Sequence, residues 1–335
     1  MERENNFELL RIIACILVII THTSSIYITY YLKIEGIEFF IANIWNSISR
    51  AAVPIFVLLS GRYSLRENIK IKKEYYKKKF KQIGIPMLNW SCIYIIYLCI
   101  VDGFDDIVGY IKSWILGVPF YHLWYLYMSI GLYFLVPYLI KLKEKIGKKK
   151  FLYLGIFFLF LGIILQKIEF FLEANNFFNK IGIFKYIYYI NLFQQLKFIK
   201  YLGYFILGYS LTELKFSTKN SGLILLITLI CMIITVQYTR NLNFYSNNYF
   251  FVMIIAISLY LFFQNMKLKI VYLRISQYTF RIYLIHVIIL VLIINNLNIT
   301  HQLGVFWGIP ILTVVVFIFS FFIAWLIKKM KFKFL

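Results

Sequence analysis

Long hydrophobic runs, separated by short polar segments rich in lysine, fill most of the chain. Within these runs the apolar residues do not alternate with polar ones, which favours helices over strands. About 20 apolar residues in a helix cross the hydrocarbon layer of a membrane, and lipid admits only helices and closed barrels. The pattern therefore predicts an all-α integral membrane protein, a bundle of about ten transmembrane helices. We expect spans near residues 7–29, 39–61, 83–101, 122–140, 151–166, 198–212, 221–237, 249–264, 278–296 and 305–327.

The positive charges predict how the bundle is oriented. If the N-terminus is inside, 25 of the 36 lysines and arginines fall in the inner segments and 8 in the outer ones. Cytoplasmic loops carry such an excess, so we expect both termini in the cytoplasm. The bias also accounts for the net charge of +22 without nucleic acid as a partner.

Composition narrows the class further. The chain is 61% hydrophobic, with a mean hydropathy of +0.77, and it has no long polar stretch. We therefore expect a single transmembrane domain over residues 1–335, in contact with membrane lipids. The four cysteines lie in hydrophobic segments without a CxxC or Cys/His pattern, so we expect buried thiols and no metal site.

The first span carries two ionisable residues, Arg11 and His22, in the stretch RIIACILVIITH. Eleven helical steps bring them roughly 16 Å apart on one face, with Cys15 and Val18 between them. Ionisable groups at membrane depth usually face a protein interior or a water-filled path and mark a functional site. Alternatively, Arg11 pairs with Glu8 one turn earlier and His22 lies at the outer interface.

Further cationic groups lie within other spans. Arg50 falls near mid-depth, before AAVPIFVLLSG, and needs either an anionic ligand or a distant acidic partner. Pro54 and the following Ser-Gly pair predict a kinked, closely packed helix there. Arg281 and His286 share the ninth span, either as packing anchors or as part of the same set of buried cations.

Two more segments suggest binding. The lysine cluster with Lys78, Lys79 and Lys81 predicts either contact with anionic lipid headgroups or a cytoplasmic phosphate site. At the outer end of the fourth span, His122, Trp124 and Tyr125 belong either to the aromatic belt or to a sugar-binding entrance, because aromatic rings stack on sugars.

Together these motifs resemble the membrane-bound acyltransferase-3 family, in particular its single-domain O-acetyltransferases of bacterial surface polysaccharides. The resemblance rests on R-x10-H (Arg11, His22), VPIFVLLSG after Arg50, HLWYLYMSIGLYFLVP from His122, and FRIYLIH ending at His286. One departure is that the R-x-x-R often found before the third span's proline reads Lys79-Phe80-Lys81-Gln82 here. Lysine keeps the charge but lacks the planar fork of arginine.

The resemblance implies an enzyme that moves an acyl group, acetyl by default, from cytoplasmic acyl-CoA to a hydroxyl of an extracytoplasmic cell-surface glycan. It implies a multi-pass protein of the bacterial cytoplasmic membrane, with acetyl-CoA or another acyl-CoA as donor and no tightly bound cofactor. The site residues it implies are His22 and Arg11 as catalytic, Arg50, Lys78, Lys79 and Lys81 as donor-binding, and His122, Trp124 and Tyr125 as acceptor-binding.

The same residues leave two other classes open. Cationic groups on a line across the membrane also suit a transporter or flippase of an anionic or lipid-linked saccharide. A non-catalytic anchor of a polysaccharide-export complex would bind no acyl-CoA at all. Within the enzymatic hypothesis, direct transfer and a covalent acyl-histidine intermediate are both compatible with the sequence.

Overall fold

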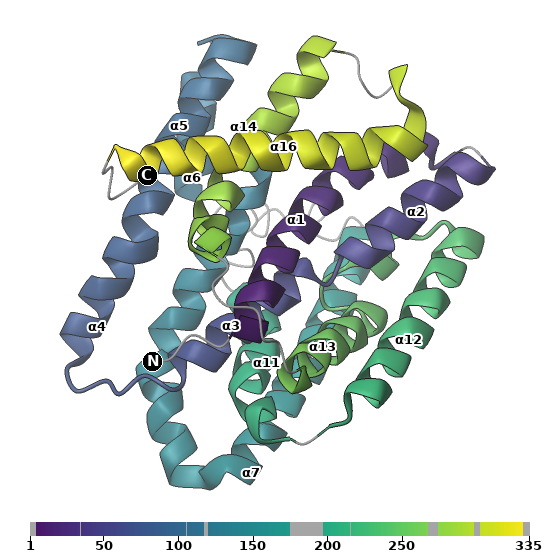
Figure 1. Cartoon of the computed structure of the whole chain (residues 1–335). Coiled ribbons are helices and arrows are strands. Elements are labelled where there is room, and N and C mark those ends of the chain that lie inside the picture. Colours follow the sequence, from purple (N-terminus) through teal and green to yellow (C-terminus); the bar gives the residue numbers. More distant parts are fainter. Residues whose placement is uncertain are drawn as a thin grey trace. The chain divides into compact units, whose positions relative to one another are not determined.

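The computed structural model describes residues 5–33, 35–104, 106–116, 120–174, 197–214, 216–266, 274–297 and 302–330, and all regular structure in these ranges is helical (Figure 1). Eight helical stretches among them are long and apolar enough to cross a membrane. Each expected span coincides with helical structure, although the second is divided between two helices, the fourth and fifth share one long helix, and the sixth has only 14 residues. The all-α membrane fold is confirmed, whereas the count of about ten and the side of the termini stay predictions.

The chain folds as two compact units, which are described separately. The first unit comprises Met1–Leu59 and Leu211–Lys331, and the second is formed mainly by Ser60–Ser210. The expectation of one transmembrane domain stays a prediction.

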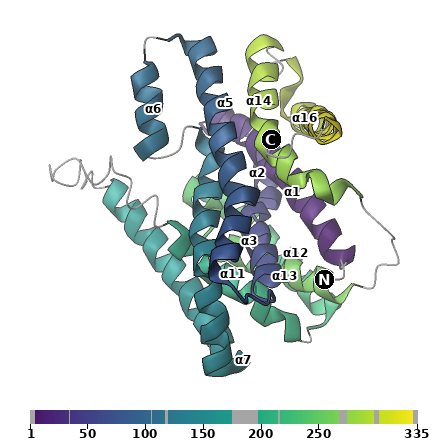
Figure 2. The same cartoon turned by 90° about the vertical axis from the view of Figure 1, so that its left-hand side faces the viewer.

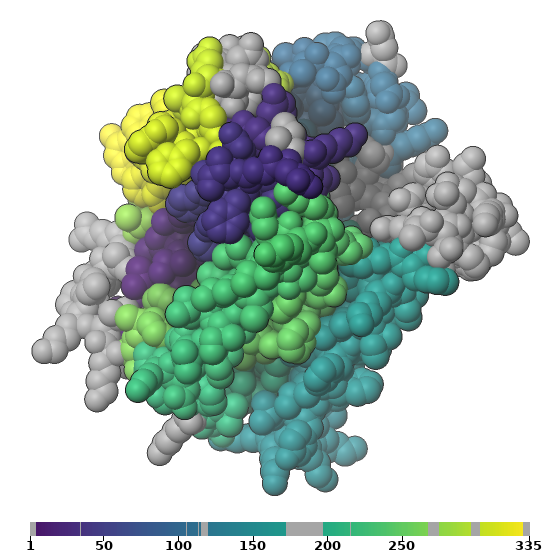
Figure 3. Space-filling model, turned by 90° about the vertical axis from the view of Figure 1, so that its right-hand side faces the viewer, coloured from purple at the N-terminus to yellow at the C-terminus, as the bar shows by residue number. Residues whose placement is uncertain are grey.

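Helix α1 is the centre of the first unit. It packs against α2, α13, α14 and α16, and α2 packs in turn against α12 (Figures 1 and 3). The outer face of α12 carries exposed leucines and isoleucines, as expected for contact with acyl chains. The helices are α1 (Asn5–Tyr31), α2 (Ile37–Ser49), α3 (Ala52–Ser64, which continues into the second unit), α12 (Thr218–Thr239), α13 (Phe250–Asn265), α14 (Thr279–Leu297) and α16 (Gly304–Lys329).

The second expected span is broken, as the sequence predicts. Helix α2 ends at Ser49 and α3 begins at Ala52. Pro54 has no N–H for the carbonyl of Arg50, and its ring crowds that carbonyl. The neighbouring carbonyl of Ser49 accepts a hydrogen bond from the hydroxyl of Thr21 at 3.2 Å, so α1 satisfies part of the backbone that the break exposes.

The second unit is built on two arms of α7 (Trp124–Ala174), which bend at Gly147. Gly147 has φ 78°, a conformation that costs glycine least. Helix α11 (Lys197–Ser210) packs closely against α7. A Cβ on Gly203 would lie 2.3 Å from the backbone nitrogen of Leu159, so the two helices meet backbone to backbone.

The basic segment begins the third span. Helix α4 (Lys72–Lys79) passes through a π-helical turn (Phe80–Gly84) into α5 (Ile85–Asp102). Pro86 follows this turn and donates no backbone hydrogen bond, which favours the wider turn before it. Helix α6 (Ile107–Leu116) lies beside α5 (Figure 2).

Candidate active site

Two histidines meet in the first unit. The ring centroids of His22 on α1 and His286 on α14 are 5.2 Å apart. Seven residues earlier on each helix, the thiol of Cys15 lies 3.7 Å from the carbonyl oxygen of Thr279 and donates to it. Helices α1 and α14 therefore run parallel and in register, and the stripe of α1 that carries Cys15 and His22 faces α14.

The hydrogen bonding of His286 fixes the orientation of its ring. His286 is fully buried, and its Nδ1 donates to the carbonyl oxygen of Tyr283 at 2.6 Å. A carbonyl oxygen only accepts, so Nδ1 carries the proton. In the neutral ring, Nε2 is then the nitrogen that can take a proton. The alternative of His286 as one of the buried cationic groups stays untested.

Arg50 lies at the end of α2 and is bonded to α1 at Ser25, one helical turn after His22. Its Nε donates to Asn46 Oδ1 at 2.5 Å and its Nη2 to Ser25 Oγ at 3.2 Å. Its guanidinium carbon lies 4.7 Å from the ring centroid of Tyr245. Among the described residues no carboxylate forms an ion pair with Arg50. The amide of Asn46, the hydroxyl of Ser25 and the ring of Tyr245 hold it in place instead.

Sequence reasoning missed the network that holds this arginine. Asn46 Nδ2 donates to Ser24 Oγ at 2.9 Å, and the hydroxyl of Tyr245 donates to Asn43 Oδ1 at 2.6 Å. A signal was present, because Asn43, Asn46, Ser47 and Arg50 recur at helical spacing on one face of a span. Arg50 is thus held by Asn46 on α2, by Ser25 on α1 and by Tyr245 in the short 3-10 turn Leu242–Tyr245.

Arg11 lies at the other end of the stripe. Its Nη1 is 3.5 Å from Glu8 Oε1, so the pairing one turn earlier is present. His22 is half-buried and packs against the fully buried His286, and its outer-interface alternative stays untested. Arg281 is half-buried on α14, two residues after Thr279.

The predicted donor-binding lysines belong to the second unit and differ in exposure. Lys79 Nζ lies 3.2 Å from Glu67 Oε1 and 4.5 Å from the ring centroid of Tyr133. Lys78 and Lys81 are exposed. The structure thus leaves Lys78 and Lys81 open to a ligand, whereas the charge of Lys79 is already paired with a carboxylate.

The predicted acceptor-binding residues also lie in the second unit. His122 is buried, and its ring centroid lies 4.8 Å from that of Tyr94 in an edge-to-face arrangement. Trp124 is half-buried and stacks obliquely near Tyr201, with ring centroids 5.5 Å apart. Tyr125, beside Trp124, is also half-buried. Of the three, His122 is buried, whereas Trp124 and Tyr125 are partly exposed.

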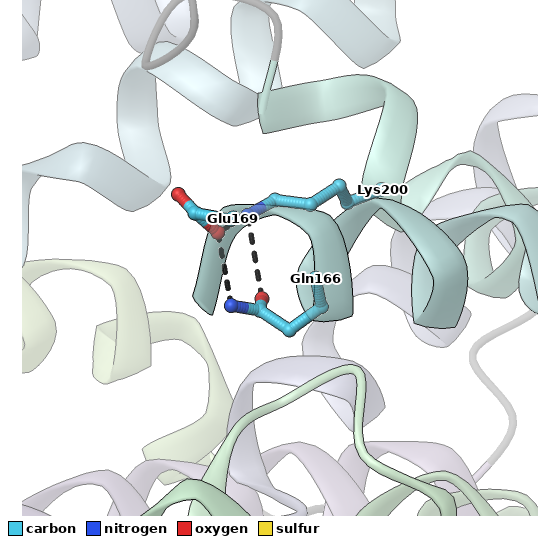
Figure 4. A network of polar contacts seen from close by, with 3 residues as sticks. All are labelled: Gln166, Glu169 and Lys200. Carbon is cyan, nitrogen blue, oxygen red and sulfur yellow. Dashed lines mark hydrogen bonds and ion pairs between the residues drawn. The ribbon is translucent and has the colours of Figure 1, made fainter. Parts of the chain in front are cut away.

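A partly buried ion pair near these aromatics was not predicted from the sequence. Lys200 on α11 donates to the carboxylate of Glu169 and, at 3.3 Å, to Gln166 Oε1, and both of these residues lie on the second arm of α7 (Figure 4). Gln166 Nε2 donates to Glu169 at 2.9 Å, which closes the triangle. The helix continues to Ala174, so Glu169 lies in α7 and not in the outer loop that the sequence predicts after residue 166.

A family model of the acyltransferase domain, Acyl_transf_3, matches residues 4–329 of this chain. The chain belongs to the acyltransferase-3 family. No curated protein and no solved structure gives a significant match.

The chain is therefore a multi-pass membrane protein of an acyltransferase family, which does not favour the transporter and flippase alternative. Acyl transfer needs a group that takes a proton and a positive group for the developing oxyanion. In this acyltransferase the imidazoles of His22 and His286 and the guanidinium of Arg50 lie in one unit and offer both. The described residues hold no cluster of His, Cys, Asp or Glu suited to a metal ion.

Proposed function

We propose that this acyltransferase moves an acyl group, by default acetyl, from cytoplasmic acyl-CoA to a hydroxyl of a glycan on the outer side of the bacterial cytoplasmic membrane. The observation that carries the proposal is the pair of imidazoles 5.2 Å apart on parallel helices, with Arg50 bonded to α1 one helical turn after His22. Such an arrangement inside a membrane-spanning unit is costly without a function.

His22 is the general base in this proposal. It takes the proton of the acceptor hydroxyl as that oxygen attacks the thioester carbonyl, which typically contributes 10²–10⁴-fold to the rate. The new C–O bond gives a tetrahedral oxyanion, which collapses as the C–S bond breaks. The thiolate of CoA leaves and takes up the proton, so the products are the O-acyl glycan and free CoA. His286, held by Tyr283, keeps the facing imidazole in place.

Arg50 binds the donor at its thioester. The guanidinium is positioned by Asn46 and Ser25 before any ligand arrives, and these bonds use two of its five N–H groups. The remaining donors can meet the carbonyl oxygen as charge develops on it. Arg11, Lys78 and Lys81 serve the phosphates of the donor, whereas Lys79 is already paired with Glu67; His122, Trp124 and Tyr125 serve the acceptor sugar through stacking and hydrogen bonds.

The test is the variant His22→Gln, assayed in purified protein for the release of free thiol from acetyl-CoA in the presence of surface glycan. We expect a loss of at least 10²-fold in kcat, while the acetyl-CoA-dependent rise in melting temperature is kept. Thr29→Ala is the matched control, because Thr29 lies exposed on the same helix. If His22→Gln retains a rate within threefold of the control, His22 is not the general base. If acetyl-CoA does not stabilise the wild-type protein, a non-catalytic anchor is favoured.

A further inference from the structure

An open groove lies between the π-helical turn and the first arm of α7. It has a volume of about 310 Å³ and is lined by two helix faces. On one face Tyr76, Phe80 and Ile83 follow one another at helical spacing, and on the other Ile130 and Phe134 do so. The two faces are joined at one end, where the hydroxyl of Tyr76 donates to the carbonyl oxygen of Phe134 at 3.1 Å.

The groove opens on a hydrophobic surface of the protein. Phe80 and Phe134 are each 56% exposed, and both belong to helices apolar enough to cross a membrane. Phe134 lies within the expected fourth span, where an exposed phenylalanine faces acyl chains, and Phe80 lines the same groove from the opposite side. The groove extends from Tyr76 to Gly84, eight residues or roughly 12 Å of helix, close to the depth of one leaflet.

A positive charge lies at the foot of the groove. One helical turn before Tyr76, the ammonium of Lys72 lies 4.2 Å from the ring centroid of Tyr138, which is itself one turn beyond Phe134. Among the described residues no carboxylate forms an ion pair with Lys72. Lys73 and Lys77 are exposed at the same end, so the foot attracts anions while the walls are apolar.

The inner wall of the groove is closed and electrically neutral. Lys79 lines it, but its ammonium is paired with Glu67 and lies near the rings of Tyr75 and Tyr133. Gly84 keeps the groove open, because a Cβ there would lie 2.5 Å from the ring of Phe80. An occupant would therefore meet apolar walls along its length and positive charge at the foot, from Lys72 against Tyr138 and from the exposed Lys73 and Lys77 beside it.

We propose that this groove binds one anionic phospholipid, with an acyl chain between the two helix faces and its phosphate against Lys72. The apolar walls suit an acyl chain, and the lysine at the foot of the groove suits the phosphate of the headgroup. The inference does not depend on the proposed acyl transfer, since its ligand is not a substrate. It explains the basic segment as a specific lipid site and leaves Lys78 and Lys81 to the donor.

The test uses the purified full-length protein in detergent, titrated with phosphatidylglycerol or with phosphatidylcholine of the same acyl chains and followed by native mass spectrometry. We expect one saturable phosphatidylglycerol, bound at least fivefold more tightly than phosphatidylcholine. Lys72→Gln should weaken phosphatidylglycerol about fivefold and leave phosphatidylcholine unchanged, since one lysine contributes about 1 kcal/mol to anionic lipid binding. Lys141→Gln, an exposed lysine on α7, is the matched control.

Filling the groove is the second arm of the test. Ile83→Trp should weaken both lipids, whereas Ile96→Trp, at a 58% exposed isoleucine farther along α5, should weaken neither. Equal affinity for the two lipids, or Lys72→Gln binding as tightly as its control, overturns the proposal. Binding of hexadecanoyl-CoA that is lost in Ile83→Trp, without any saturable phosphatidylglycerol, would assign the groove to the donor instead and also overturns it.

Discussion

Replacing Arg50 is the most informative single change in the first unit. The side chain makes two hydrogen bonds, to Asn46 and Ser25, and lies over the ring of Tyr245. Arg50→Gln removes the charge, and Arg50→Lys keeps the charge but cannot reach both oxygen partners with a planar fork. The pair of variants therefore separates the charge from its positioning.

The expected magnitude follows from the proposed contact with the thioester oxygen. Loss of one donor to a developing oxyanion typically costs about 10²–10³ in kcat, or about 2.7–4 kcal/mol. We expect this loss in kcat for Arg50→Gln, with the KM for acetyl-CoA changed less than threefold. Arg50→Lys should recover about tenfold of the lost rate, because an ammonium still offers charge near the same place.

Stability is measured in parallel, since Arg50 also holds its neighbours. Asn46 keeps its Nδ2 bonds to Ser24 and Ser25 when the guanidinium is absent, and we expect a cost of about 1.5–3 kcal/mol for each of the two charged hydrogen bonds that are lost. The matched control is Arg240→Gln in the same unit, whose guanidinium carbon lies 3.7 Å from the ring centroid of Phe39.

The assay is thiol release from acetyl-CoA with glycan acceptor, over a range of donor concentrations, on protein whose melting curve is recorded. A rise in KM at unchanged kcat would contradict a role at the thioester and place Arg50 on the phosphates of the donor. An Arg50→Gln enzyme with wild-type kcat and KM would refute both roles and leave Arg50 as a packing residue.

Two further predictions concern the second unit. The double variant Lys78→Ala/Lys81→Ala should raise the KM for acetyl-CoA several-fold with little change in kcat, because both lysines are exposed and open to the donor. An unchanged KM would show that these lysines only orient the protein in the membrane and do not bind the donor. Lys200→Met should lower stability by about 1–3 kcal/mol because the partly buried carboxylate of Glu169 loses its cation and keeps only Gln166 as donor, and Lys200→Met/Glu169→Leu should regain most of this in thermal unfolding. A double variant no more stable than Lys200→Met would show that the pair is not the cause.

Interruptions of the helices were readable from the chain because their causes are local. Pro54 predicted the break between α2 and α3, since a missing N–H acts four residues back along the same helix. The bend at Gly147 lies in the lysine-rich segment that separates the fourth and fifth expected spans, but that one helix continues across it was not predicted. Within α1, the spacing of Cys15 and His22 placed them on one face before any partner was known.

The sequence by itself determined that the chain is an all-helical membrane protein and where its apolar segments lie. It also determined which motifs belong to the acyltransferase-3 family. These properties depend on composition and on spacing along single helices. Only the tertiary structure decided that His286 faces His22, that Asn46 and Ser25 hold Arg50, and that Glu67 takes the charge of Lys79. The physical reason is that a side chain's partner is set by which helices pack together and in what register, and residues from distant segments carry no record of that in their own spacing.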